Sequence, residues 1–218
     1  ARVFIEKPIS VNFNDVEDLI KKRQDGLWID IGYNRRYAEI TQKTKDILSS
    51  ITRPFVITMC VKELKLPKTH WYFWKNQGTR ITGNVCHWID LAYYFISSKP
   101  CEISLLNTGD SVVLGLLFED GSIVNIIASD LGNDKKGVEE YIEIRGADTT
   151  IKINDFKILK TTGFKNKYIF KFKRDKGHYF MYRDLKRRWL TALPEKYPTE
   201  DMYWVSYLVS KSTEMLYH

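Results

Sequence analysis

The sequence lacks long apolar runs, paired cysteines and low-complexity segments. Across its 218 residues, no apolar stretch is long enough to span a bilayer, and the first residues do not have the layout of a signal peptide. The three cysteines, Cys60, Cys86 and Cys101, are odd in number and show no paired metal-ligand spacing. The sequence therefore predicts a reduced, cytoplasmic protein with no membrane partner and no metal site.

Glycine is sparse, at 12 residues, and no segment is rich in it. The pattern Gly-x-Gly-x-x-Gly, which holds a dinucleotide pyrophosphate at a helix amino terminus, is absent. None of Gly132, Gly137 and Gly146 opens a helix after a strand in the required way. The acidic residue that would bind the cofactor ribose is absent as well. The sequence therefore offers no cradle for a dinucleotide pyrophosphate.

The first 32 residues have the pattern of a strand, a helix and a second strand. Val3–Ile5 is a short, β-prone apolar run, and Leu27–Gly32 is another. Between them, Asn14 has the position of a helix N-cap, with a reciprocal glutamate three residues on, and Gly26 marks the helix end. Such units build parallel sheets, but two parallel strands alone leave both sheet edges uncovered. We therefore expect this unit to be the end of a larger sheet.

From residue 33 onward the pattern changes to a few helices and many short strands. One helix should end near Ser49, a second should surround His87, and the tail from Tyr179 should be helical with Thr199 as an N-cap. Asp120-Gly121 is the signal of a tight hairpin. Runs of β-type residues occupy Phe55–Val61, Glu102–Leu106, Ser111–Phe118, Ser122–Ala128, Tyr141–Arg145 and Thr150–Ile153. The sequence thus predicts an α+β fold, a mostly antiparallel open β-sheet with helices packed on one face.

Two places in the sequence could carry chemistry. His87 lies three residues before Asp90, so the two side chains are neighbours on the expected helix. A carboxylate beside an imidazole raises its basicity, as a general base requires. Lys7 follows the carboxyl end of a buried parallel strand, where open α/β sheets bind ligands. Each residue also has a plain structural interpretation: a hydrogen-bonded histidine at a helix edge, and a solvated lysine at a strand end.

Several short motifs follow one another in an order typical of one known family. They are Ile5-Glu6-Lys7-Pro8, Gly32-Tyr33-Asn34-Arg35-Arg36, Leu66-Pro67-Lys68-Thr69-His70-Trp71, Gly78–Asp90, Asp120-Gly121-Ser122, Glu139–Gly146, Asn154-Asp155-Phe156 and Asp175-Lys176-Gly177-His178. With them, the chain resembles the carboxyl-terminal two-thirds of the glucose–fructose oxidoreductase / inositol dehydrogenase (Gfo/Idh/MocA) family. The surroundings of His87 look most like the branch found beside bacterial surface-polysaccharide genes. Where the family usually has an aspartate four residues before this histidine, the chain has Gly83, followed by Asn84.

The resemblance implies an oxidoreductase that uses NAD or NADP and acts on a sugar, nucleotide-sugar or polyol hydroxyl. In such enzymes the lysine that corresponds to Lys7 lies near nicotinamide and substrate, and Glu6 and Pro8 flank it at the cofactor. The histidine that corresponds to His87 accepts or returns the hydroxyl proton, and we expect Asp90 to support it. The implied substrate-binding residues are Asn34, Arg35, His70, Trp71, Arg80 and Asn84.

The resemblance also implies a division of the chain at residue 32. Residues 1–32 would be the carboxyl-terminal remnant of a truncated Rossmann domain. Residues 33–218 would form the substrate-binding and oligomerisation domain. Because the pyrophosphate cradle is missing, we expect only the full-length protein to bind NAD or NADP, and this chain alone to be inactive.

Two other functions fit parts of the sequence. The net charge of +7 suggests an anionic partner, and residues 157–188 interleave basic and aromatic residues, as single-strand-binding modules do. Residues 168–173, however, fit better with a half-buried strand that carries lysines outward at a sheet edge, so we expect no nucleic-acid partner. The strand at residues 55–61 is apolar on both faces. This favours a homodimer or tetramer formed through the sheet face, either within an enzyme or as a non-catalytic assembly domain.

Overall fold

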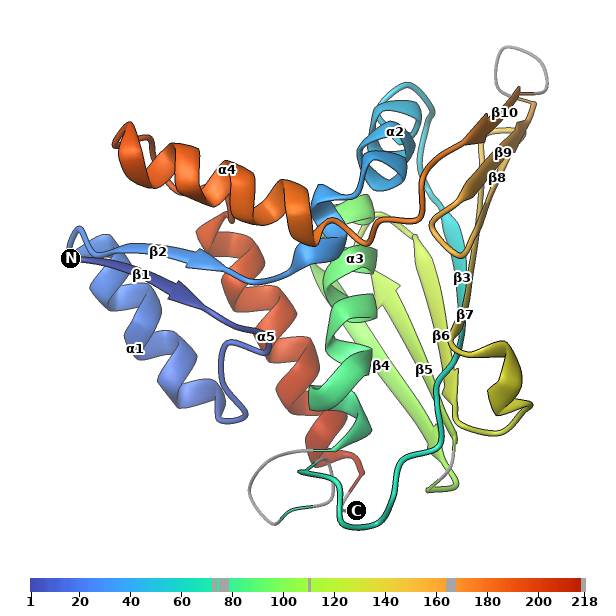
Figure 1. Ribbon diagram of the computed structural model, residues 1–218, viewed down its shortest axis with the longest axis horizontal. Coiled ribbons are helices and arrows are strands. Elements are labelled where there is room, and N and C mark those ends of the chain that lie inside the picture. Colours follow the sequence, from blue (N-terminus) through green and yellow to red (C-terminus); the bar gives the residue numbers. More distant parts are fainter. Residues whose placement is uncertain (72–73, 75–78, 110, 164–167, 217–218) are drawn as a thin grey trace.

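The computed structural model describes residues 1–71, 74, 79–109, 111–163 and 168–216 (Figure 1). The described strands form a two-stranded sheet and an eight-stranded sheet. No helix in the described part of the chain is both long enough and apolar enough to cross a membrane.

The smaller sheet is the expected strand–helix–strand unit. Strand β1 (Arg2–Ile5) pairs in parallel with β2 (Trp28–Ile31), and helix α1 (Phe13–Gln24) connects them. The predicted N-cap at Asn14 is wrong. The cap is Asn12, whose side chain accepts a hydrogen bond from the Asn14 backbone N–H, so the helix begins two residues earlier. Both residues are asparagines, which can cap a helix, and the extended backbone at Asn12 makes that residue the cap.

The larger sheet is mostly antiparallel, as the sequence predicts. Its strand order is β10-β9-β8-β7-β3-β6-β5-β4, and among these pairs only β3 and β6 run parallel. The bounds are β3 (Val56–Lys62), β4 (Pro100–Asn107), β5 (Ser111–Phe118), β6 (Ile123–Ser129), β7 (Glu139–Gly146), β8 (Thr149–Asn154), β9 (Ile158–Thr162) and β10 (Tyr168–Lys171). The expected hairpin joins β5 and β6, with Gly121 at φ +81° in its turn. Strand β10 is at the edge of the sheet, and Lys171 points outward as expected.

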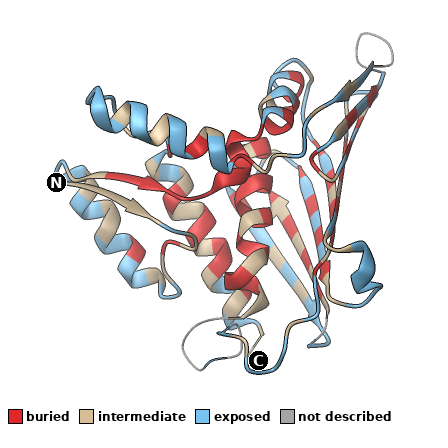
Figure 2. Cartoon of the chain, viewed as in Figure 1, coloured by how far each residue is buried: buried red, intermediate tan, exposed pale blue. Residues whose placement is uncertain are grey.

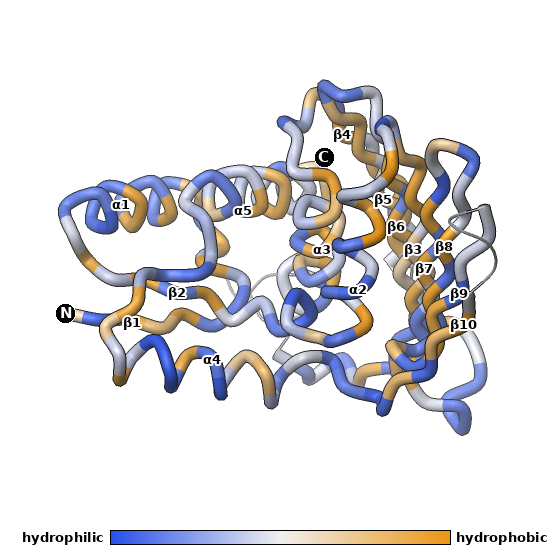
Figure 3. Tube along the Cα trace, turned by 90° about the horizontal axis from the view of Figure 1, so that it is seen from above, coloured by the Kyte–Doolittle hydropathy of each residue, from blue (hydrophilic) through white to orange (hydrophobic). Residues whose placement is uncertain are grey.

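Helices cover one face of this sheet and leave the other open. Helices α2 (Glu39–Leu48), α3 (Cys86–Ile96) and α5 (Thr199–Glu214) lie on the covered side (Figures 1 and 3). Figure 2 shows burial concentrated along α3 and α5 and alternating along the strands. In β3, Ile57 and Met59 are fully buried, whereas Val56 is 47% exposed on the open face. The predicted α+β architecture is therefore confirmed, with an open sheet face that carries apolar side chains.

The ribbon of β1 and β2 lies between two groups of helices. Helices α1 and α5 are on one side, and α4 (His178–Leu190) is on the other (Figure 3). Trp189 of α4 packs edge-on against Trp28 of β2. The expected N-cap at Thr199 is wrong, because α5 begins with Thr199 and the cap position is Pro198. This arrangement brings the carboxyl ends of β1 and β2 to the start of α3.

Candidate functional site

Lys7 follows the carboxyl end of β1, and its side chain contacts the π-helical turn that precedes α3. Its ammonium donates a hydrogen bond to the carbonyl oxygen of Gly83 at 2.5 Å. Gly83 belongs to η3 (Ile81–Val85), a π-helical turn that leads directly into α3. A π-helical turn displaces carbonyls from their ordinary i, i+4 pairing and is frequent at functional sites. The two segments that the sequence singles out, around Lys7 and around Gly83, therefore meet.

His87 stands on the same part of this helix. It lies four residues after Gly83, so its side chain is on the helix face of the carbonyl that Lys7 contacts. The ring of Tyr33 packs edge-on against the imidazole, with ring centroids 6.1 Å apart. Nδ1 of His87 is buried and has no hydrogen-bond partner among the described residues. A buried ring nitrogen without a partner is unusual in proteins and points to a role that packing does not explain.

The surroundings of His87 keep its ring neutral. Burial lowers the pKa of His87 well below its ordinary value of 6.5, and the positive charges of Arg35 and Lys7 lower it further. At physiological pH an unprotonated ring nitrogen is therefore present and can accept a proton.

The expected pair of His87 and Asp90 is not formed. Both carboxylate oxygens of Asp90 accept hydrogen bonds from the guanidinium of Arg36, at 2.6 to 2.9 Å, and one also accepts from Tyr197 at 2.6 Å. Arg36 is bonded to Asp201 as well. Asp90 is fully buried in this network, because a guanidinium offers a fixed fork of donors that a carboxylate can accept on both oxygens. The support that we expected Asp90 to give His87 is therefore wrong, and its role in this structure is to join α3 to the turn after β2.

Asn34 and Arg35 lie in a short 3₁₀ turn, η1 (Asn34–Tyr37), and both are buried. The Asn34 amide donates to the backbone carbonyl of Lys176 at 2.6 Å. Arg35 donates to Glu140 at 2.8 Å and lies 4.7 Å from the ring centre of Trp88. Lys176 forms a second ion pair with Glu140, also at 2.8 Å. Burial alone raises the pKa of Glu140, but the two cations outweigh it, so the pKa lies below its ordinary value.

Arg80 and Asn84 share one carboxylate, that of Glu63. Glu63 directly follows β3 and is 7% exposed. One of its oxygens accepts from the Asn84 amide, and the other accepts from Arg80. Arg80 also donates to Asp130 at 2.8 Å. The positive charge of Arg80 is therefore already balanced by two carboxylates, which leaves it poorly suited to bind a substrate phosphate.

A cavity of about 190 Å³ lies between these two groups. Asn84 lines it three residues before His87, so the cavity and the imidazole are on the same side of the helix. Equal numbers of cationic and acidic side chains line it. The full lining is Arg35, Glu63, Leu64, Leu66, Asn84, Val138, Glu140 and Lys176.

The chain was compared with known proteins by sequence and by structure. No family model matches the sequence. The chain is 25% identical over 139 residues to an uncharacterised oxidoreductase, YrbE, of Bacillus subtilis (strain 168), an alignment that covers 57% of this chain and 40% of that protein. The relative is thus matched over less than half of its own length.

Solved structures match almost the whole chain. A UDP-N-acetylglucosamine 3-dehydrogenase, GnnA, from Acidithiobacillus ferrooxidans superposes with a TM-score of 0.80 at 15% identity, over 97% of this chain and 69% of that one. A protein from Desulfitobacterium hafniense, described as an NADPH-dependent oxidoreductase, gives 0.81 at 14% identity, over 99% and 71%. This chain has the fold of the Gfo/Idh/MocA-type dehydrogenases.

Within the Gfo/Idh/MocA fold, the predicted cofactor residues Glu6 and Pro8 flank Lys7 in the chain. Glu6 accepts a hydrogen bond from the Tyr182 hydroxyl at 3.1 Å, and its carboxylate lies against Gly32, where a Cβ would meet it at 2.8 Å. Pro8 follows a cis peptide bond. Their assignment to the cofactor stays a prediction.

His70 and Trp71 lie on the loop after Leu66, which lines the cavity. Their rings face each other with centroids 5.5 Å apart, and Trp71 is 41% exposed. Neither is among the residues that line the cavity, so their role in binding a substrate stays a prediction.

Three residues of the site have no clear signal in the sequence. Glu63 and Glu140 are acidic residues at strand ends, and Tyr33 follows β2. Their importance comes from partners more than fifteen positions away, which a local pattern does not show. Tyr33, Glu140 and Lys176 lie in motifs that the family resemblance includes, but the sequence assigns them no role, and Glu63 lies in none of these motifs.

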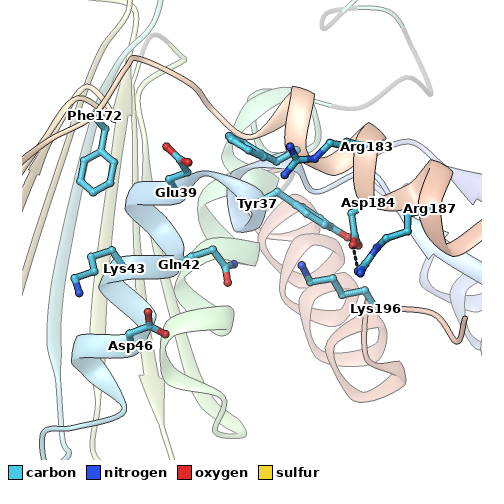
Figure 4. A pocket seen from close by; sticks show the side chains of 11 residues that line it. Tyr37, Glu39, Gln42, Lys43, Asp46, Phe172, Arg183, Asp184, Arg187 and Lys196 are labelled. Carbon is cyan, nitrogen blue, oxygen red and sulfur yellow. Dashed lines mark hydrogen bonds and ion pairs between the residues drawn. The ribbon is translucent and has the colours of Figure 1, made fainter.

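A larger hollow lies elsewhere in the described part of the chain. It has a volume of about 870 Å³ and lies between α2 and α4 (Figure 4). Its charged side chains are of both signs, and Figure 4 shows Asp184 paired with Arg187. Lys43, Arg183 and Lys196 on its walls are exposed, as ordinary surface residues are. None of the residues that the sequence predicts for the site lines this hollow, whereas Arg35 and Asn84 line the smaller cavity, so we do not consider it the functional site.

The described residues fit only part of a dinucleotide cofactor. Lys7 stands at the carboxyl end of a parallel strand, where such sheets bind ligands. A glycine-rich turn between a strand and a helix, which would hold the pyrophosphate, is not among them. Nor do they contain a group of three or more His, Cys, Asp or Glu side chains that could hold a metal ion.

Proposed function

We propose that this chain is the carboxyl-terminal part of an NAD(P)-dependent oxidoreductase that transfers hydride to or from a sugar, nucleotide-sugar or polyol carbon. The observation that carries the proposal is the hydrogen bond from Lys7 to Gly83, which joins the end of the parallel ribbon to the helix turn that bears His87. The names of the similar proteins support a dehydrogenase, and one of them is described as NADPH-dependent. NAD and NADP remain equal alternatives.

The proposed chemistry assigns one task to each of the two residues. As a hydroxyl is oxidised, its proton must leave, and the neutral imidazole of His87 accepts it at an unprotonated ring nitrogen. Lys7 uses one of its three N–H groups on Gly83 and has others for the substrate oxygen, where negative charge develops. In the reverse direction His87 returns the proton. Bound nicotinamide would supply the hydride chemistry itself.

The cavity favours the neutral part of such a substrate. Arg35 and Lys176 are paired with Glu140, and Arg80 is paired with Glu63 and Asp130. These cations already have partners, so a polyhydroxyl group fits the cavity better than a phosphate does. One similar structure is a UDP-N-acetylglucosamine 3-dehydrogenase, so a nucleotide-linked sugar is included, with its sugar part in the cavity.

The proposal is tested by turnover of the full-length protein. It is incubated with NAD⁺ or NADP⁺ and, in separate assays, with D-glucose, myo-inositol or UDP-N-acetylglucosamine, and reduced nicotinamide is followed by absorbance. We expect turnover with at least one pair. The absence of reduced cofactor with every sugar and polyol of a wider panel would refute the proposed function. In calorimetry, the 218-residue chain alone should bind neither cofactor, because the pyrophosphate cradle is not among its described residues.

We also propose that the open sheet face forms a homodimer or tetramer. Val56, Ile123 and Ile127 are apolar and exposed on that face, at 37 to 47%. An apolar sheet face of this kind is suited to pair with a second copy of itself. The three cysteines that the structure describes are free thiols, which accords with the reducing, cytoplasmic location that we propose.

A further inference from the structure

The carboxylate of Glu63 holds the side chain of Asn84 at the cavity. Asn84 lies in the π-helical turn η3, three residues before His87, and lines the cavity. Its amide nitrogen donates a hydrogen bond to Glu63, which directly follows β3. Two segments more than twenty residues apart therefore fix one polar side chain at the cavity wall.

We propose that Glu63 is a positioning residue that orients Asn84, so that the Asn84 carbonyl oxygen accepts a hydrogen bond from one substrate hydroxyl. The proposal rests on the proposed function for the nature of the substrate. Asn84 is then a specificity-determining residue. Glu63 affects the substrate only by orienting Asn84, and Arg80 only by holding Glu63.

The orientation of the Asn84 amide follows from the chemistry of its partner. The nitrogen and oxygen of an asparagine side chain look alike in shape and are assigned from their hydrogen bonds. An ionised carboxylate only accepts hydrogen bonds, so the Asn84 nitrogen must face Glu63. The Asn84 oxygen then faces away from Glu63. This oxygen makes no hydrogen bond within the described part of the chain. The buried polar atoms without a partner do not include it, so it is not a buried atom. The oxygen is therefore accessible.

Glu63 is itself held firmly in place. Its second oxygen accepts from Arg80, and Arg80 is also bonded to Asp130, which follows β6. The side chains of Glu63 and Arg80 are only 10% and 12% exposed. An anchored carboxylate can hold an amide in one orientation, whereas a solvated one would let it rotate. The role of Arg80 is thus to hold Glu63, which replaces the expected direct contact with substrate.

The other polar groups of the cavity leave few acceptors for a hydroxyl. Both oxygens of Glu140 already face cations, Arg35 and Lys176. Both oxygens of Glu63 accept hydrogen bonds from protein groups. The Asn84 side chain is the neutral polar group of this lining, and its oxygen makes no hydrogen bond within the described residues, so we assign the substrate hydroxyl to it. At about 190 Å³, the cavity has the volume of about six water molecules, which suits a small polyhydroxyl group.

The orientation can be tested without any substrate. In the full-length protein, the side-chain NH₂ resonances of Asn84 should be shifted and slow to exchange with solvent, because the Glu63 carboxylate is a charged acceptor. Glu63→Gln keeps the size of the side chain but lets it donate as well as accept, so the Asn84 signals should move toward those of a solvated asparagine. Glu139→Gln, at an exposed glutamate that begins β7, is the matched control and should leave them unchanged.

The recognition of a hydroxyl is tested with substrate and its monodeoxy analogues. The probe is whichever of D-glucose, myo-inositol and UDP-N-acetylglucosamine the wild-type enzyme turns over. Asn84→Ala and Glu63→Gln should raise KM about tenfold, the usual scale for one hydrogen bond in a site, and change kcat less than threefold. The wild type should bind one monodeoxy analogue about tenfold more weakly than the parent substrate. Asn84→Ala should bind the two equally well, because the hydroxyl that the analogue lacks is the partner of the missing Asn84 side chain.

Each outcome has a definite meaning. If turnover is normal and both variants leave KM unchanged for every analogue, Asn84 does not select a hydroxyl, although the proposed function stands. If Glu63→Gln leaves the Asn84 resonances unchanged, the positioning role is wrong. If the wild type turns over no sugar or polyol, the proposed function and the hydroxyl recognition both fail, and the resonances alone decide whether Glu63 orients Asn84.

Discussion

Replacing Asp90 with asparagine tests whether this carboxylate serves the fold or the chemistry. Asp90 accepts three hydrogen bonds from Arg36 and one from Tyr197, and it is fully buried. Removing one partner of a buried ion pair usually costs about 3–5 kcal/mol, because the remaining charge is left uncompensated. Arg36 keeps its bond to Asp201, so we expect the lower end, about 3 kcal/mol.

The assay is equilibrium unfolding in urea, followed by tryptophan fluorescence. With a dependence of about 3 kcal/mol per molar urea, the loss corresponds to a fall in the unfolding midpoint of about 1 M. Asp18→Asn is the control, since Asp18 pairs with Lys21 on the exposed face of α1, and its midpoint should not move. Replacing Arg36 by Met, Asp90 by Leu and Asp201 by Asn together should cost less than Asp90→Asn alone, because no charge of this network is then left without its partner.

A different outcome would contradict the structural role of Asp90. If Asp90→Asn unfolds at the wild-type midpoint while kcat of the full-length enzyme falls a hundredfold, Asp90 acts in the chemistry. The structural role derived from its bonds to Arg36 would then be wrong.

The pKa values of His87 and His178 lie below 6.5 in the folded protein, so below about pH 6.5 the unfolded chain binds more protons than the folded one. The stability that these two groups contribute is therefore full above that pH and is lost as the pH falls below it. Urea titrations at about pH 7.5 and 5.5 should show a smaller loss of stability for His87→Gln than for the wild type. Gly177 has φ +89°, and a Cβ there would lie 2.1 Å from the carbonyl oxygen of Asn34. Thermal unfolding should find Gly177→Ala far less stable than Gly137→Ala, because the Cβ at residue 137 meets open space and only backbone strain of about 1–3 kcal/mol remains. Ile127→Lys on the open sheet face should turn the proposed oligomer into a monomer in light scattering, and a wild type that is monomeric at every concentration would contradict the proposed interface.

The sequence predicts most of the fold because local patterns specify most of its elements. Strand β5 alternates buried and half-buried residues over its full length, and the Asp120-Gly121 turn fixes its pairing with β6. The sequence does not predict β9, which has five residues, of which only Leu159 and Thr161 are buried. Its pairing with β8 and β10 makes it a strand, and that information is not local.

The candidate site is predicted less completely for the same reason. The positions of Lys7 and His87 follow from a strand end and a helix motif, and the structure brings their segments together. The partner of Asp90 does not follow, because helix spacing points to His87 while a guanidinium 54 positions away forms stronger bonds. Likewise, nothing near Glu63 in the sequence indicates that it holds Asn84.

The central claim is that Lys7 and His87 carry the chemistry, and turnover of the full-length enzyme tests it most directly. His87→Ala and Lys7→Ala should each lower kcat by about a hundredfold or more, the usual scale for losing a general acid–base group. Cofactor affinity should change little in His87→Ala, and Lys135→Ala, at an exposed lysine of the turn after β6, should behave as wild type. A full-length His87→Ala enzyme with normal kcat would contradict the account and leave His87 as a packing residue.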